Sequence, residues 1–208
     1  MKRDAISRCF LPAAFLLACS LAQAQTLIIS QIADGGPWQT TIVLTNTGAS
    51  AAVASLSFFQ EVAGGATQNW NLAFLEVNST QNLPLPAGGT LFLHTPGAPG
   101  PTLQGWAQLQ ADPSVAAYAI FTQRVPGRQD QDGTSAAAAS GSRILVPFDN
   151  TNGFVTSMAI ANTTGSSENI SVGIRTAAGT VSQASSIMLP AQGHTAFAFP
   201  QQLPATAG

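Results

Sequence analysis

The sequence predicts an all-β protein with two tandem immunoglobulin-like β-sandwich repeats, the second of which lacks its last strands. Three observations support this prediction. Short apolar or β-branched segments alternate with Gly-, Asn- and Pro-containing turns roughly every 8–12 residues, as in sandwiches and barrels. Beyond the first residues no apolar stripe has the helical period of 3.6; Ala136–Ala139, between two glycines, is the best helical candidate. One strand-and-turn pattern also occurs twice.

In this repeat, Ile28–Phe58 aligns with Ile144–Ile174 at an offset of 116 residues. Each copy has an apolar strand, a Gly/Asp/Asn turn, an aromatic residue, a second strand, an Asn-Thr turn and a third strand. Further along, the Leu-Pro-Ala segments at 85–89 and 189–193 align at an offset of 104. A recurring order of turns and strands in two separate blocks indicates a true repeat.

The chain begins with an expected signal peptide, residues 1–24. Lys2 and Arg3 supply positive charge, Phe10–Ala18 is apolar and too short for a membrane span, and Ala22-Gln23-Ala24 resembles a cleavage site. The alternative is a lipoprotein anchored at Cys19, in the segment Leu-Leu-Ala-Cys. Cleavage after Ala24 would remove both cysteines, so no disulfide is expected.

The first repeat is expected to cover residues 25–124, with alternating residues such as Leu56 and Phe58 facing its core. The seven predicted strands are Leu27–Ile32, Trp38–Thr45, Ala52–Gln60, Gln68–Glu76, Thr90–His94, Gly105–Ala111 and Val115–Arg124.

Residues 125–142, rich in small residues, are predicted to be a flexible or surface linker. The second repeat, 143–208, should turn Ile170, Val172 and Ile174 inward and have about five strands, since nothing corresponds to the last two strands of the first repeat. The shift from offset 116 to 104 reflects a hairpin carrying Trp70 that only the first repeat has.

Charge is scarce: only 8% of the residues are charged, against about 25% in typical soluble proteins. Without residues 1–24 the chain keeps four arginines and eight acidic residues, a net charge of 4 − 8 = −4, and no lysine. Such a surface argues against binding nucleic acid or an anionic membrane. A neutral polar surface is typical of an extracellular or cell-envelope protein.

Few residues point to catalysis or metal binding. His94 and His194 each adjoin an apolar strand, but no motif supplies a nucleophile, a metal set or a phosphate loop. Asp130 and Asp132 resemble half of a calcium loop, although Arg128 occupies its first position and Ala139 its last. Ordinary strand-end and turn roles are favoured for these residues, and no cofactor is expected.

Trp70 is the best binding candidate, because its ring is flanked by the amides of Asn69 and Asn71. An aromatic face with amides beside it could stack on a sugar ring, whereas a core tryptophan on an alternating strand is the simpler interpretation.

Four segments carry a family resemblance: GPWQTTIVLTNTG, LPAGGT, GWAQL and VPFDNTNGFVTSMAIAN. They resemble a group of uncharacterised exported bacterial proteins, and the Asn-Thr-Gly turn is similar to that of bacterial immunoglobulin-like and cell-adhesion-related domains. The resemblance implies a β-sandwich and an extracytoplasmic location, and it carries over no catalytic residue. In that group the second module usually looks complete, so the end at Gly208 departs from the pattern.

The expected function is therefore that of an exported, non-enzymatic surface or interaction module whose partner is a protein or a glycan. A carbohydrate-binding module using Trp70 is the first alternative. A secreted hydrolase or metal-dependent enzyme using His94, His194 or the Asp130/Asp132 loop is the second. Open sheet edges would allow strand pairing with another chain.

Overall fold

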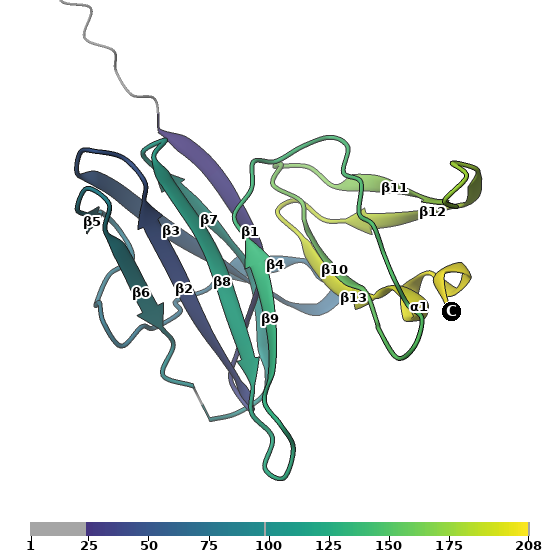
Figure 1. The fold of residues 1–208 in the computed structure, drawn as a ribbon, viewed down its shortest axis with the longest axis horizontal. Helices are drawn as coiled ribbons and strands as arrows, with labels where there is room; N and C mark the ends of the chain where they lie inside the picture. Colours follow the sequence, from purple (N-terminus) through teal and green to yellow (C-terminus); the bar gives the residue numbers. More distant parts are fainter. Residues whose placement is uncertain (1–23, 98, 208) are drawn as a thin grey trace, which may run out of the picture.

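The structure is a computed structural model that describes residues 24–97 and 99–207. Apart from Ala24, the expected signal peptide and Cys19 lie outside the described residues. The predicted β-rich architecture is confirmed: the chain forms several antiparallel sheets and one short α-helix (Figure 1). Within the described part, no helix is long and apolar enough to cross a membrane.

Two sheets pack face to face in the N-terminal part, which we call the N-terminal sandwich. The first sheet consists of β1 (Gln25–Asp34), β7 (Leu103–Ala111), β3 (Ala52–Glu61) and β4 (Thr67–Asn69) in that order, with β5 (Leu83–Leu85) also paired to β3.

The second sheet has the order β6 (Thr90–His94), β2 (Trp38–Asn46), β8 (Val115–Gln123) and β9 (Gln131–Ala136). The hairpin of β7 and β8 therefore contributes one inner strand to each sheet. A short 3-10 helix, η1 (Ala63–Gly65), precedes β4.

The core lies between the two sheets and follows the alternation of the strands. Leu56 and Phe58 on β3 are buried, as predicted, while Ser57 between them is exposed. Ala107 and Leu109 on β7 and Ala119 on β8 are completely buried in the same cluster. Small residues on the β7–β8 hairpin allow close approach of the sheets, and the larger residues opposite fill the space.

The predicted strand at Gln68–Glu76 is wrong beyond Asn69, because this segment crosses from one sheet to the other. Trp70 donates its backbone N–H to Phe58 of the first sheet, and Leu75 donates to His94 of the second. Leu72 and Phe74, between these two contacts, are buried in the core. A segment that closes the side of a sandwich cannot pair with one neighbour along its whole length.

The segment expected to be a linker contains a strand. β9 pairs antiparallel with β8, from Tyr118 opposite Ala136 to Gln123 opposite Gln131. Two residues further on, Ala138 exchanges two backbone hydrogen bonds with Ile28 of β1. The segment therefore closes the second side of the sandwich, and Gly141–Thr156 is the part without a helix or strand.

The C-terminal lobe, residues 143–207, contains two separate strand pairs (Figure 1). One consists of β10 (Ser157–Ala161) and β13 (His194–Ala198), the other of β11 (Glu168–Arg175) and β12 (Val181–Leu189). The lobe ends with α1 (Phe199–Gln202) and the 3-10 helix η2 (Pro204–Thr206), and Ile174, Phe199 and Leu203 form its small buried cluster.

The strand register of the N-terminal sandwich recurs in this lobe at both offsets found in the sequence. Thr41 pairs with His94 between β2 and β6, and Ser157 (41 plus 116) pairs with Ala198 (94 plus 104) between β10 and β13. In the same way, Ala52 pairs with Leu85 between β3 and β5, while Glu168 pairs with Leu189 between β11 and β12.

The lobe lacks the two strands that the sequence indicated, the counterparts of β7 and β8, and also two that it did not indicate. Within the described residues, nothing corresponds to β7, β8 or β9 in the C-terminal lobe. Residues 143–150, which correspond to β1, form no strand, so the lobe has four strands instead of about five. In the sandwich β1 pairs with β7, and without that partner an isolated strand has no ladder of hydrogen bonds to stabilise it.

Candidate functional site

The Trp70 hairpin lines an open pocket of about 390 Å³ on the N-terminal sandwich. Trp70 and its neighbours Asn69 and Asn71 all line it, together with Thr80 and Gln81. Trp70 is half-buried and packs against the core, whereas both asparagines are exposed. The structure thus places the three predicted carbohydrate-binding residues around one pocket. The Trp70 indole packs against the core and also lines this pocket.

The two histidines occupy separate environments. His94 ends β6 and is about half exposed; its Nδ1 lies 2.5 Å from Glu76 Oε1, and its backbone N–H donates to the other carboxylate oxygen. Burial raises the pKa of Glu76, but the hydrogen bonds from His94 outweigh this effect and leave the pKa below its usual value. The contacts between His94 and Glu76 hold the crossing segment against the second sheet.

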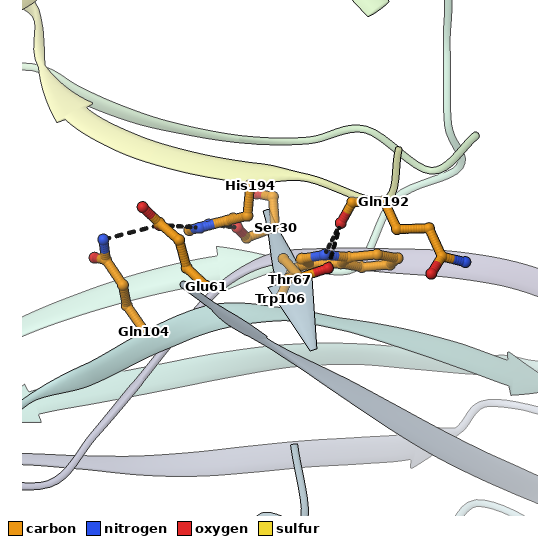
Figure 2. Close-up of polar contacts among 7 residues, drawn as sticks. All are labelled: Ser30, Glu61, Thr67, Gln104, Trp106, Gln192 and His194. Atoms are coloured by element: carbon orange, nitrogen blue, oxygen red, sulfur yellow. Dashed lines mark hydrogen bonds and ion pairs between the residues drawn. The ribbon is translucent and has the colours of Figure 1, made fainter. Parts of the chain in front are cut away.

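His194 begins β13 and is completely buried between the sandwich and the C-terminal lobe (Figure 2). Its Nε2 lies 2.9 Å from the carbonyl oxygen of Ser30, and its Nδ1 lies 2.7 Å from Glu61 Oε2. Because a carbonyl oxygen only accepts, Nε2 must be the donor of that bond. Gln104 also donates to Glu61 Oε2, at 2.9 Å, so β1 and β3 bond to this ring and β7 supports the Glu61 carboxylate.

A second group of contacts lies beside His194 and is centred on the carbonyl oxygen of Gln192 (Figure 2). It accepts hydrogen bonds from Trp106 Nε1 at 3.1 Å and from Thr67 Oγ1 at 2.7 Å. Trp106 is buried, and its ring stacks on Phe59 at a centroid distance of 4.2 Å. A Cβ at Gly193 would lie 2.7 Å from the carbonyl oxygen of Gly65, so the two backbones meet too closely for a side chain.

These contacts explain two residues whose role the sequence could not show. Trp106 is a buried residue of β7 whose indole N–H donates to Gln192 of the other lobe. His194 was expected to be a strand-end polar residue. Its side chain bonds instead to Glu61 and Ser30, which precede it in the sequence by 133 and 164 positions. No local pattern signals contacts at such separations.

Asp130 and Asp132 lie at the β8–β9 hairpin, both exposed. Asp130 pairs with Arg124 at 3.4 Å, and Asp132 lies within β9 opposite Thr122. Among the described residues, no group of three or more histidine, cysteine or carboxylate side chains is close enough to hold a metal ion. Neither histidine lies with these aspartates, so the residues proposed for the enzyme alternative are not brought together.

Asp34 is a buried carboxyl group at the end of β1. It is 5% exposed, and its Oδ1 has no hydrogen-bond partner among the described residues. Burial raises its pKa above the ordinary value, against the opposing effect of hydrogen bonds from Thr95 and Gly35.

The C-terminal lobe exposes much of its apolar surface. Leu145 is 83% exposed, whereas Ile29, its counterpart in β1, is fully buried. Ile174 is buried as predicted, but Ile170 and Val172 are only half-buried. Seven of the twelve large apolar side chains that are exposed in the described chain lie here: Ile144, Leu145, Phe148, Phe154, Val155, Val181 and Met188.

Comparisons with known proteins identify no relative: no family model, no curated protein and no solved structure matches the chain.

Proposed function

We propose that this is an exported, non-enzymatic interaction protein, built from tandem immunoglobulin-like repeats, whose C-terminal lobe binds a protein partner. The observation that carries the proposal is the concentration of exposed apolar side chains in that lobe, with Leu145 and Met188 exposed by 83% and 72%. Apolar residues gathered on a surface are typical of binding sites.

Export is the second part of the proposal, and its support comes from the sequence. The positively charged start, the short apolar run and the Ala22-Gln23-Ala24 site fit a cleaved leader, with a lipid anchor at Cys19 as the alternative. The low charge and the lack of lysine after residue 24 fit a location outside the cytoplasm. The resemblance to exported bacterial modules with adhesion-related domains supports the same location.

The proposed immunoglobulin-like architecture departs from the constant-type domain in its strand order. In constant-type immunoglobulin domains the first two strands share a sheet. Here β1 lies with β7 and β3, and β2 lies in the other sheet. The repeated registers of β2 with β6 and of β3 with β5 support a tandem arrangement.

The contact between the lobes supports a presenting role. His194 and the carbonyl oxygen of Gln192 are bonded to Ser30, Glu61, Thr67 and Trp106 of the sandwich. Bonds of fixed geometry on both sides of Gly193 hold the lobe in one orientation. A partner would then meet a preformed surface, which lowers the entropic cost of binding.

Site-specific photocrosslinking in the cells that make the protein tests this proposal. A photoreactive amino acid at Leu145 should give a discrete crosslinked product with a second protein. The matched control is the same amino acid at Tyr118, an exposed residue on the outer face of β8. No product at Leu145, or equal products at both positions, would contradict a binding surface on the C-terminal lobe.

A second candidate function, carbohydrate binding, rests on the open pocket beside Trp70. Asn69, Asn71 and Gln81 line this pocket together with Trp70. Aromatic faces and amide groups together can recognise the apolar and hydroxyl surfaces of a sugar.

A glycan array with the unmodified protein and two variants tests this candidate. Trp70→Ala should abolish glycan binding, and Trp70→Phe, which keeps an aromatic ring against the core, should retain part of it. No glycan binding, or binding that Trp70→Ala leaves unchanged, would exclude the candidate.

A further inference from the structure

We propose that the C-terminal lobe binds one extended β-strand of a partner protein along the edge of β11, in the position that β7 holds beside β3. The inference rests on the proposed interaction function and specifies the kind of partner. Its occupant is a segment of a separate polypeptide, extended and low in charge, with small or aliphatic residues at every second position.

The N-terminal sandwich provides the template for this complex. β7 lies between β1 and β3 and is antiparallel to both. Leu109 is the central point, because it lies opposite Leu27 on one side and Leu56 on the other. A single strand therefore joins two neighbours and completes the first sheet.

The C-terminal lobe contains the sequence counterparts of both neighbours of β7. β11 corresponds to β3, and its pairing with β12 repeats the register of β3 with β5. Residues 143–150 correspond to β1 at the same offset of 116. Within the described residues no strand pairs with β11 opposite β12, so one edge of this strand lacks a paired strand.

Apolar side chains of β11 and of residues 143–150 are more exposed than their counterparts in β3 and β1. On β3, Ala54 and Leu56 are 1% and 0% exposed, while their counterparts Ile170 and Val172 are only half-buried. Leu145 is 83% exposed where Ile29 is fully buried. β11 and residues 143–150 thus carry apolar residues at the positions of β3 and β1, but these side chains are more exposed than their counterparts.

The side chains of β7 indicate the chemistry of the occupant. Ala107, Leu109 and Ala111 point into the core and are buried, whereas Gln108 and Gln110 point away. An occupant of β11 needs the same alternation, because Ile170 and Val172 would face its inward residues. Charged residues at inward positions would be buried without a partner, which is costly.

Strand addition supplies both affinity and selectivity. The backbone of the added strand provides hydrogen bonds to an open sheet edge, and alternate side chains enter apolar positions. Residues 143–150 would then pair with the outer side of the added strand and take the place of β1. Leu145 would become buried in that complex.

Peptide binding to the protein purified after export tests the proposal. The probe is a fluorescently labelled peptide with the sequence of residues 103–111, LQGWAQLQA. The control peptide exchanges position 107 with 108 and position 109 with 110, which reverses the alternation at constant composition. We expect saturable binding of the first peptide only, with new hydrogen-exchange protection at β11 and at residues 143–150.

Two variants of the protein locate the site. Leu145→Lys places a charge where the added strand should pack, and it leaves the unbound fold intact because the side chain is already exposed. Ser171→Lys adds the same charge to the opposite, exposed face of β11. We expect the first variant to weaken peptide binding by at least about tenfold, equivalent to 1.4 kcal/mol, and the second to bind normally.

Three results would overturn the proposal: no saturable binding, equal binding of both peptides, or protection gained only in the N-terminal sandwich. A dimer of the protein alone whose β11 is already protected would also overturn it, because a second copy would then occupy the edge. Photocrosslinking at Leu145 is independent of the peptide, so a crosslink without peptide binding would leave the interaction function standing and remove only the strand.

Discussion

Asn46 and Asn162 show how one residue type fixes the same corner twice. The side-chain amide of Asn46 donates to the carbonyl oxygens of Ser50, Leu85 and Pro86. Asn162 donates to the corresponding oxygens at 166, 189 and 190. Both side chains are buried, so each joins the end of one sheet to the turn that leads into the next strand.

Replacing Asn46 with alanine should lower the free energy of unfolding by roughly 3 kcal/mol. The change removes the bonds to these three oxygens and the bonds that Asn46 Oδ1 accepts from Gly48 and Ser114. A buried polar group that loses its partner costs about 1–3 kcal/mol. Urea unfolding measures the effect. The matched control is Asn78→Ala, at an exposed position, which should change stability by less than about 0.5 kcal/mol. Equal effects at Asn46 and Asn78 would refute the structural role.

Asp34 should make the stability of the protein fall as pH rises. Burial raises the pKa of this carboxyl group in the folded state, so folding favours the protonated form. Ionising the buried Asp34 carboxyl group therefore costs free energy of folding. This cost is absent below the pKa of the unfolded state, about 3.9. It grows as pH rises toward the pKa of the folded state and is constant above it.

The variant Asp34→Asn removes this titration. Relative to the unmodified protein, it should gain stability between pH 4 and 7, on the order of 1 kcal/mol. Urea unfolding of both proteins across that range gives the difference and cancels the contributions of the other carboxyl groups. A difference that does not vary with pH, or that reverses its sign, would contradict a raised pKa at Asp34.

His194→Ala should loosen the contact between the two lobes. The variant loses the bonds to Ser30 and Glu61 and leaves the Glu61 carboxylate with fewer partners. We expect this to weaken the free energy of association between the two lobes by roughly 2 kcal/mol. Nuclear magnetic relaxation should show one shared tumbling time for both lobes of the native protein and faster, separate tumbling in the variant. His94→Ala, at an exposed position on β6, is the control and should keep one tumbling time.

At the scale of elements, the least expected observation is that β9 closes the sandwich where a linker was predicted. Its sequence, QDGTSA, has no apolar alternation because it is an edge strand with mostly exposed side chains. Gly133 lies against the ring of Phe121, at a spacing that leaves no room for a Cβ. A glycine needed for close packing looks, in sequence, like a glycine of a flexible segment.

Limited trypsin digestion distinguishes a strand from a linker. Arg128 lies in the tight β8–β9 turn, where its N–H donates to Val125, and Arg143 lies in the segment that has no helix or strand. We expect cleavage after Arg143 to be several times faster than after Arg128, since proteases need an extended, unpaired backbone. Faster cleavage after Arg128 would favour the linker interpretation.

The elements that the sequence predicted well are those with a local pattern. Six of the seven strands predicted for the first repeat are present, Thr90–His94 with the predicted ends and the others with ends shifted by one or two residues. Alternation and turn residues can be recognised within about ten residues of sequence. The segment after Asn69 and strands β5 and β9 escaped prediction. Their conformation depends on which sheet they reach, and that information is not local.

The candidate sites divide in the same way. The sequence grouped Trp70 with Asn69 and Asn71, and these three residues, adjacent in the chain, line one pocket. It could not show that His194 meets Glu61, since 133 residues separate them. Contacts between residues so far apart in the sequence can be predicted only from an alignment of relatives or from the three-dimensional structure.

At the scale of the whole molecule, the two offsets of the repeat explain the division into lobes. The sandwich has a β7–β8 hairpin that contributes an inner strand to each sheet, and the C-terminal lobe repeats only β2, β3, β5 and β6. The lobe therefore buries less apolar surface, and its stability should be lower than that of the sandwich.

Hydrogen exchange of the isolated protein, followed residue by residue, tests this account most directly. We expect the amides of β2, β3, β7 and β8 to exchange only through global unfolding, and those of β10 to β13 to exchange faster through opening of the C-terminal lobe alone. Uniform protection across both lobes in the monomer would contradict the account, because the C-terminal lobe would then be as complete a folding unit as the sandwich.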